Sequence, residues 1–197
     1  MKEGFSIPRK NRLWFPGAIY HTVVRGNHKD IIFKDTTDYF VYMKYLKMVC
    51  ETHPFDLYSY CLMGNHIHLQ IATLDDEIWK IMQKINWKYS MYFNRKYDQT
   101  GHLFQNRYYS KIMDSESLLL QTSRYIHLNP VKAGIVQNPI QYEWSSYRVF
   151  MGTMKNNLVK EDIILSYFQD STNRNDKLDR ALYREYVECE DEEIKEV

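Results

Sequence analysis

Two histidines separated by one residue, His66 and His68, are the first candidates for chemistry. They lie in a segment that alternates polar and apolar residues, and in a strand this alternation places both imidazoles on one face together with Gln70. Two adjacent imidazoles can ligate one cation, and two partly exposed strand histidines without a ligand are the ordinary alternative. The pair alone leaves both interpretations open.

A tyrosine and an asparagine four residues apart form the second candidate pair. On a helix, Tyr125 and Asn129 lie about one turn apart on the same face. Pro130 disfavours helical geometry in the residue before it, so the helix is expected to end near Leu128, where the Asn129 carboxamide oxygen can turn toward a cation. A core or rim tyrosine and a C-terminal cap asparagine are the alternatives.

The elements around these residues predict an α+β fold. Strands are expected at 19–25, 55–63, 66–72 and 103–112, and helices at about 36–52, 75–97 and 114–128. The first helix is expected to be capped by Thr36 or Thr37. The order β-α-β-β-α-β is the split βαβ arrangement of a ferredoxin-like domain with an antiparallel sheet. The added helix carries Tyr125 and packs beside the sheet, and the imidazole face is expected to stay open.

Composition indicates one domain in a reducing compartment. A length of 197 residues allows a single domain with some additions. Three cysteines at wide spacings argue against a disulfide framework, and no segment approaches the roughly 18 apolar residues of a membrane span. We therefore expect a cytoplasmic protein without membrane contact.

Charge is distributed unevenly along the chain. The formal net charge is +1, and residues 188–197 hold six acids and one lysine, which leaves +6 for residues 1–187. A moderately basic body suits a polyanionic ligand, although many proteins without such a ligand have the same charge. Aromatic residues make up 15% of the chain, and some of the rings are expected to face a ligand.

Three segments together resemble a known family. They are residues 60–68 (YCLMGNHIH), 125–134 (YIHLNPVKAG) and 144–147 (WSSY), with shorter matches at Arg25-Gly26, Phe93-Asn94 and Gly101. In order and spacing, over about residues 17–150, they resemble the REP-associated tyrosine transposases. These belong to the single-tyrosine HUH transposases of bacteria, which mobilise or process single-stranded DNA. One departure is Gly64, where family members more often have proline.

The resemblance implies roles for four residues. His66 and His68 would be metal ligands, Asn129 the third protein ligand, and Tyr125 the nucleophile that forms a 5′-phosphotyrosine. Such a site would suit Mg²⁺ or Mn²⁺, because its protein ligands are neutral, one of them is an oxygen, and coordination positions remain open for phosphate and water. The resemblance also implies the IS200-like transposase fold, in a bacterial, nucleoid-associated protein that is a monomer or a homodimer. The chain would comprise an arm at 1–16, a catalytic domain at 17–150 and an acidic-ended tail at 151–197, with helices expected near 161–169 and 176–188.

Single-stranded or hairpin DNA is the partner that this reading implies. Residues expected to contact it, through phosphates or by ring stacking, are Arg25, Asn27, Lys80, Lys84, Lys88, Arg107, Tyr108 and Tyr109. A solvated helix face is the alternative for the three lysines, and a place in the sheet is the alternative for the two tyrosines. Gln70 is a candidate for orienting a water or the phosphate.

Two rival functions fit parts of the pattern. A non-catalytic DNA-binding regulator could keep the fold, although it would have no reason to retain all four site residues together. A zinc-stabilised domain could instead combine Cys61 with His66 and His68.

Overall fold

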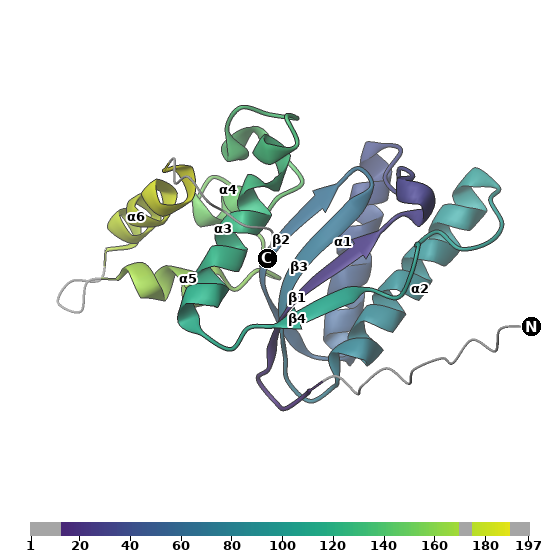
Figure 1. Cartoon of the computed structure of the whole chain (residues 1–197), viewed down its shortest axis with the longest axis horizontal. Helices are drawn as coiled ribbons and strands as arrows, with labels where there is room; N and C mark the ends of the chain where they lie inside the picture. Colours follow the sequence, from purple (N-terminus) through teal and green to yellow (C-terminus); the bar gives the residue numbers. More distant parts are fainter. Residues whose placement is uncertain (1–12, 170–174, 190–197) are drawn as a thin grey trace, which may run out of the picture.

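A four-stranded antiparallel sheet forms the centre of the fold (Figure 1). The computed structural model describes residues 13–169 and 175–189. The strands are β1 (Ile19–Arg25), β2 (Phe55–Met63), β3 (His66–Thr73) and β4 (Tyr109–Ile112), in the spatial order β2-β3-β1-β4. Gly64 and Asn65 form the turn between β2 and β3, so the strands predicted at 55–63 and 66–72 pair as an antiparallel hairpin.

The register of the sheet decides which side chains share a face. His68 is paired with Val23 of β1 and with Cys61 of β2, and His66 is paired with Arg25. Residues directly opposite one another in an antiparallel pair lie on the same face. One face therefore carries both imidazoles, and the other carries the apolar residues between them.

Helices α1 (Thr36–Thr52) and α2 (Ile78–Tyr97) cover the apolar face (Figure 1). Ile67, Leu69 and Ile71 of β3 are fully buried in the core that these helices form with the sheet. The predicted cap of α1 is wrong by one or two residues. Asp35 is the N-cap, and its side chain accepts a hydrogen bond from the backbone N–H of Asp38 in a capping box.

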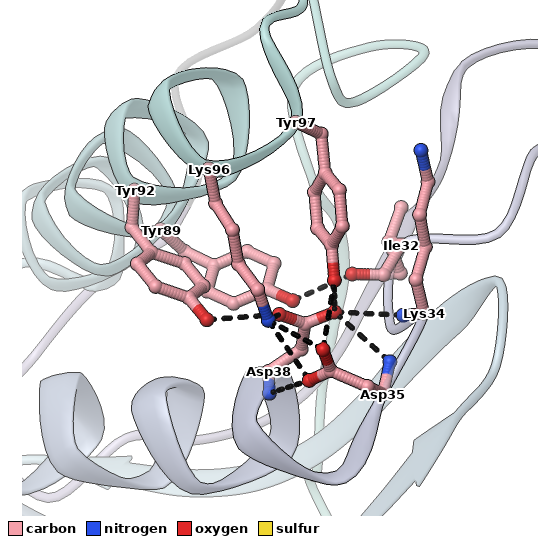
Figure 2. Close-up of polar contacts among 8 residues, drawn as sticks. All are labelled: Ile32, Lys34, Asp35, Asp38, Tyr89, Tyr92, Lys96 and Tyr97. Carbon is pink, nitrogen blue, oxygen red and sulfur yellow. Dashed lines mark hydrogen bonds and ion pairs between the residues drawn. The ribbon is translucent and has the colours of Figure 1, made fainter.

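A buried carboxylate ties the start of α1 to the end of α2 (Figure 2). Asp38 is fully buried and accepts hydrogen bonds from Tyr92 (2.9 Å), Lys96 (2.7 Å) and Tyr97 (2.7 Å) of α2. Two backbone N–H groups of the preceding loop complete its shell. Burial opposes ionisation of this carboxyl, but the hydrogen bonds from Lys96 and Tyr97 outweigh it and hold the pKa of Asp38 below its usual value.

Helix α3 (Glu116–Lys132) packs across the imidazole face (Figure 1), so the expectation that this face stays open was wrong. The expected end near Leu128 was also wrong, because the helix continues through Pro130 to Lys132. Pro130 has no N–H to donate to the carbonyl four residues earlier, so the helix loses one hydrogen bond there, and only Val131 and Lys132 follow it in the helix. Backbone bonds from Ala133 to Asn129 and from Gly134, at φ +68°, to Val131 close the helix end.

The expected strand at 103–112 forms only in its last four residues. Before Tyr109 the chain makes an isolated bridge between Phe104 and Gly26 and otherwise runs as a loop. Leu103 and Tyr108 in this loop are nonetheless buried, which accounts for the strand-like sequence pattern. Apolar side chains thus fix the loop against the core without a continuous strand.

The C-terminal helices pack against α3 and β2. The short elements are η1 (Asn27–Lys29), η2 (Pro139–Gln141), α4 (Tyr147–Phe150), α5 (Glu161–Leu165) and η3 (Ser166–Phe168), and α6 (Asp176–Glu188) follows. The helices predicted near 161–169 and 176–188 are confirmed. Tyr183 and Val187 of α6 are buried in the main core. Residues 1–12 of the expected arm at 1–16, and residues 190–197 of the acidic run at 188–197, lie outside the described residues. None of the helices in the described ranges has the length and apolar character needed to span a membrane.

Candidate metal and tyrosine site

The two histidines of β3 lie side by side on one face of the strand. The ring centroids of His66 and His68 are 4.9 Å apart with the rings nearly perpendicular. His68 is buried, while His66 is partly exposed. The Nδ1 atom of His66 lies 2.6 Å from the side-chain oxygen of Asn65, which can only accept, so this nitrogen carries the proton and Nε2 carries the lone pair.

A third histidine, His21 of β1, completes the buried imidazole group. Its Nε2 is 3.0 Å from Nδ1 of His68, and the two rings are stacked with centroids 5.3 Å apart. Sequence reasoning missed this residue. Strand alternation places His21 on the same face as Arg25, but only the pairing of β1 with β3 shows that this is the imidazole face.

Tyr125 lies against this imidazole group within the same chain. Its ring centroid is 5.6 Å from that of His68 and 6.0 Å from that of His21, both in edge contacts. The ammonium of Lys132 is 5.1 Å from the tyrosine ring centroid. Helix α3 thus brings the Tyr125 ring into contact with His68 and His21.

Asn129 meets the same group from one turn further along α3. Its Nδ2 donates to the backbone oxygen of Tyr125 at 2.9 Å, and its side chain also hydrogen-bonds the His66 ring. The carboxamide is therefore held in place by its own helix. The fold thus brings together four residues that were predicted from separate parts of the sequence: His66, His68, Tyr125 and Asn129.

Burial keeps these imidazoles neutral. It is the main cause that lowers the pKa of His66 to about 4, with the charge of Arg25 second. Burial likewise lowers the pKa of His21 to about 4 and that of His68 well below its usual value. A neutral imidazole offers a lone pair, and such nitrogens are the form in which histidine binds metals.

Two buried atoms of the group lack a partner in the described part of the chain, Nδ1 of His21 and Nε2 of His68. Among the described residues, nothing hydrogen-bonds Nε2 of His68, although it is shielded from solvent. If Nδ1 of His68 donates to Nε2 of His21, the lone pair of His68 stands on this orphaned Nε2. A cation shared with Nε2 of His66 would satisfy it, so the donor set fits a metal ion.

Gln70 does not belong to this site. Its Oε1 accepts from Ser59 at 2.8 Å and its Nε2 donates to the backbone oxygen of Leu119 at 2.9 Å, both fully inside the protein. With both ends of the carboxamide engaged, the side chain joins α3 to the sheet. The expectation that Gln70 orients a water or the phosphate was therefore wrong.

The expected DNA contacts divide between two surfaces. Arg25 and Tyr109 are exposed on the imidazole face, where Tyr109 is paired with Val23. Lys80, Lys84 and Lys88 lie on α2, across the sheet from the imidazoles, with Lys80 in an ion pair with Asp76. Of the remaining candidates, Arg107 is exposed, Tyr108 is buried and Asn27 is partly exposed.

The zinc alternative does not match the structure. Throughout residues 13–169 and 175–189, no group of three or more His, Cys, Asp or Glu side chains is arranged to hold a metal ion. Cys61 is fully buried, its Sγ donates to the sulfur of Met63, and burial raises the pKa of the thiol. A third ligand beside His66 and His68 would have to come from an amide such as Asn129.

Comparison with known proteins gives a consistent assignment. The family described as "Transposase IS200 like" matches residues 15–129. A Haemophilus influenzae protein classified as a REP-associated tyrosine transposase is 27% identical over 113 residues, which cover 51% of this chain and 64% of that protein. A solved structure of a REP-associated tyrosine transposase bound to a REP hairpin has a TM-score of 0.63 and 17% identity, with 78% of this chain and 98% of that one covered. At this identity, the structural likeness shows the fold.

Proposed function

Because the chain belongs to the IS200-like transposase family, we propose that it cleaves and rejoins single-stranded DNA with Tyr125 as the nucleophile. The observation that carries this proposal is the position of the Tyr125 ring, 5.6 Å from the ring of His68 and in the same chain. A nucleophile, two neutral imidazoles and a carboxamide thus meet in one subunit. A regulator that only binds DNA would not need this constellation.

The reaction is a transesterification at phosphorus. The phenolate oxygen of Tyr125 attacks the scissile phosphate, a P–O bond to tyrosine forms, and the P–O bond to the 3′ oxygen breaks. The leaving oxygen takes a proton and becomes a free 3′-OH, while the 5′ end stays on the enzyme as a phosphotyrosine. Attack by another 3′-OH reverses the exchange and joins strands without ATP, because the phosphoester is retained.

Charge at this site favours the attacking phenolate. A free phenol titrates at a pKa near ~10, so ionisation needs stabilisation of the anion. The Lys132 ammonium, 5.1 Å from the Tyr125 ring centroid, is placed to balance it. Arg25, exposed on the same face, is placed to contact the DNA backbone.

His66, His68 and Asn129 would hold a divalent cation, which we propose to be Mg²⁺ or Mn²⁺. Bound there, it would polarise the scissile phosphate and offset negative charge on the leaving oxygen. The chain contributes the ligand orientation: Asn65 fixes the His66 ring, and the backbone of α3 fixes the Asn129 carboxamide.

Hairpin-bearing single-stranded DNA is the substrate class that we propose. The support is the fold shared with the REP-associated tyrosine transposase that was solved with a REP hairpin. The basic charge of residues 1–187 and the exposed ring of Tyr109 on the imidazole face suit a strand with unpaired bases.

Incubation with hairpin-bearing oligonucleotides and Mn²⁺, followed by denaturing electrophoresis, tests the proposal. The wild-type protein should form a covalent adduct that peptide mapping locates on Tyr125. Tyr125→Phe should form none while DNA binding stays near wild type, and Tyr45→Phe, on α1 across the sheet, should react normally. Adduct formation that survives in Tyr125→Phe would refute the assignment, and binding without any wild-type adduct would favour the regulator.

A further inference from the structure

A hollow lies away from the imidazoles, lined mainly by residues of α2 and of the loop at 101–108 that leads to β4. Its volume is about 1280 Å³. Aromatic and amide side chains make up most of its lining, together with one arginine. The residues that matter here are Trp79, Gln83, Asn86, Trp87, Arg107 and Tyr108. We call this hollow the tryptophan groove.

Two indole rings stand exposed in the tryptophan groove. Trp79 is 44% exposed and Trp87 is 62% exposed, although both are large apolar side chains. They are eight residues apart on α2, so they lie on the same side of the helix and about 12 Å apart along its axis. Exposed aromatic surface gathered in a hollow, unlike single scattered apolar residues, indicates a ligand.

Polar groups of the tryptophan groove match the edges of nucleobases. The amides of Gln83 and Asn86 lie on α2 between the two tryptophans, and Gln105 and Asn106 line the opposite wall. Each amide presents both a donor and an acceptor. Within the described residues, the buried side-chain oxygen of Asn86 has no hydrogen-bond partner. This acceptor would gain a partner if the carboxamide turned toward a ligand.

The surroundings carry positive charge suited to phosphates. Lys84 and Lys88 each follow a groove residue by one position on α2, and Arg107 stands exposed in the opposite wall. Glu77 lines the end of the groove at the start of α2, where it accepts a hydrogen bond from the Trp79 indole. A chain of stacked bases with a phosphate backbone fits this arrangement of rings inside and cations outside.

The tryptophan groove and the imidazole face lie next to each other at the sheet edge formed by β4. Tyr108 lines the groove, and the next residue, Tyr109, is exposed on the imidazole face. β4 is the edge strand of the sheet, and only β1 separates it from β3. Neighbouring β-strands lie about 4.8 Å apart. Single-stranded DNA that leaves the imidazole site therefore has to cross only β1 and β4 to pass around the edge of the sheet and enter the groove.

We propose that the tryptophan groove binds the unpaired nucleotides of a single-stranded DNA segment that continues from the scissile phosphate, with bases stacked on Trp79 and Trp87. The proposal rests on the proposed function for the identity of the ligand, and it assigns a binding surface outside the cleavage site. The groove holds the substrate strand and takes no part in bond cleavage.

Equilibrium binding of a fluorescently labelled twelve-residue oligothymidylate tests it. All variants are made in a Tyr125→Phe background so that cleavage does not intervene. Trp87→Ala and Trp79→Ala should each weaken binding by about 5- to 140-fold, the range for loss of one base–aromatic stack. Trp87→Phe, which keeps a ring, should recover most of the affinity. Met91→Ala is the matched control, because Met91 is as exposed on α2 but does not line the groove.

Unchanged affinity in both tryptophan-to-alanine variants, with folding intact by circular dichroism, would overturn the proposal. Groove indoles that acrylamide does not quench in the free protein would overturn it too, since the groove would then already be filled without DNA. Failure of the proposed function is separate: a wild-type protein that forms no adduct but whose binding depends on Trp87 refutes cleavage and leaves the groove in place.

Discussion

Replacing His21 by leucine should weaken metal binding at a site that His21 does not itself touch. His21 accepts from or donates to His68 over 3.0 Å, and both rings are almost fully buried. With His21 present, Nδ1 of His68 can hold the proton and Nε2 the lone pair. In His21→Leu nothing accepts from Nδ1, and the tautomer with the proton on Nε2, which cannot bind a cation, becomes favourable.

Two estimates of the loss in metal affinity agree. Loss of the partner that orients a metal-binding histidine costs about 10- to 100-fold in metal affinity. That range is about 1.4 to 2.7 kcal/mol. A buried donor left without an acceptor costs about 1 to 3 kcal/mol, and the burial of both rings means that water cannot replace the lost partner. We therefore expect a Mn²⁺ dissociation constant about 10- to 100-fold higher in His21→Leu.

Titration of free Mn²⁺ by electron paramagnetic resonance measures this constant without any reaction. His21→Gln is the matched control, because a glutamine amide oxygen can accept from Nδ1 of His68 and should bind Mn²⁺ more tightly than the leucine variant. Urea denaturation confirms that both variants fold. Wild-type Mn²⁺ affinity in His21→Leu would refute the tautomer argument, and equal losses in both variants would show that packing alone matters.

Two further predictions concern stability. Asp38→Asn should lower the free energy of unfolding by about 2 to 4 kcal/mol at pH 7, because the buried carboxylate binds α2 through Lys96 and two tyrosines. Since the pKa of Asp38 is lowered, this difference in stability should shrink as pH falls below about 4. The control is Asp114→Asn at an exposed position, which should stay within about 0.5 kcal/mol of wild type in urea denaturation. A loss of stability in Asp114→Asn equal to that in Asp38→Asn would contradict the reasoning. Burial lowers the pKa of His21 and of His66 to about 4, so between pH 6.5 and 4 the unfolded chain binds protons that the native chain does not. Stability in metal-free buffer should therefore fall as pH is lowered through this window, and a flat profile by thermal denaturation would show that these imidazoles are not buried.

Local sequence patterns predicted most of the elements. The alternation in 19–25 and 66–72 and the periodicity of 75–97 correspond to β1, β3 and α2 with small shifts at the ends. Polar and apolar residue types alternate in the two strands and recur with a helical period in α2, so the period is visible in the sequence without knowledge of the neighbouring elements. The same alternation placed His66 and His68 on one face.

Contacts between distant segments could not be predicted in this way. Gln70 has the same alternation as His66 and His68, yet α3 captures its carboxamide through the backbone of Leu119. His21 joins the site because β1 lies beside β3 in one particular register. Register and helix placement depend on the whole sheet, and a one-residue shift would have turned His21 to the opposite face.

The position of Tyr125 depends on both sides of α3. Tyr125 and Asn129 face the sheet, whereas Ser123 and His127, two residues before each of them, lie about 200° around the helix. On that far side the Tyr183 hydroxyl of α6 lies 2.7 Å from the Ser123 hydroxyl and 2.8 Å from Nδ1 of His127, all within the buried core. Displacing α3 would break these bonds and leave buried polar atoms without their partners. The C-terminal helix thus holds the tyrosine helix against the sheet, and the approach of phenol to imidazole is built into the fold of one subunit.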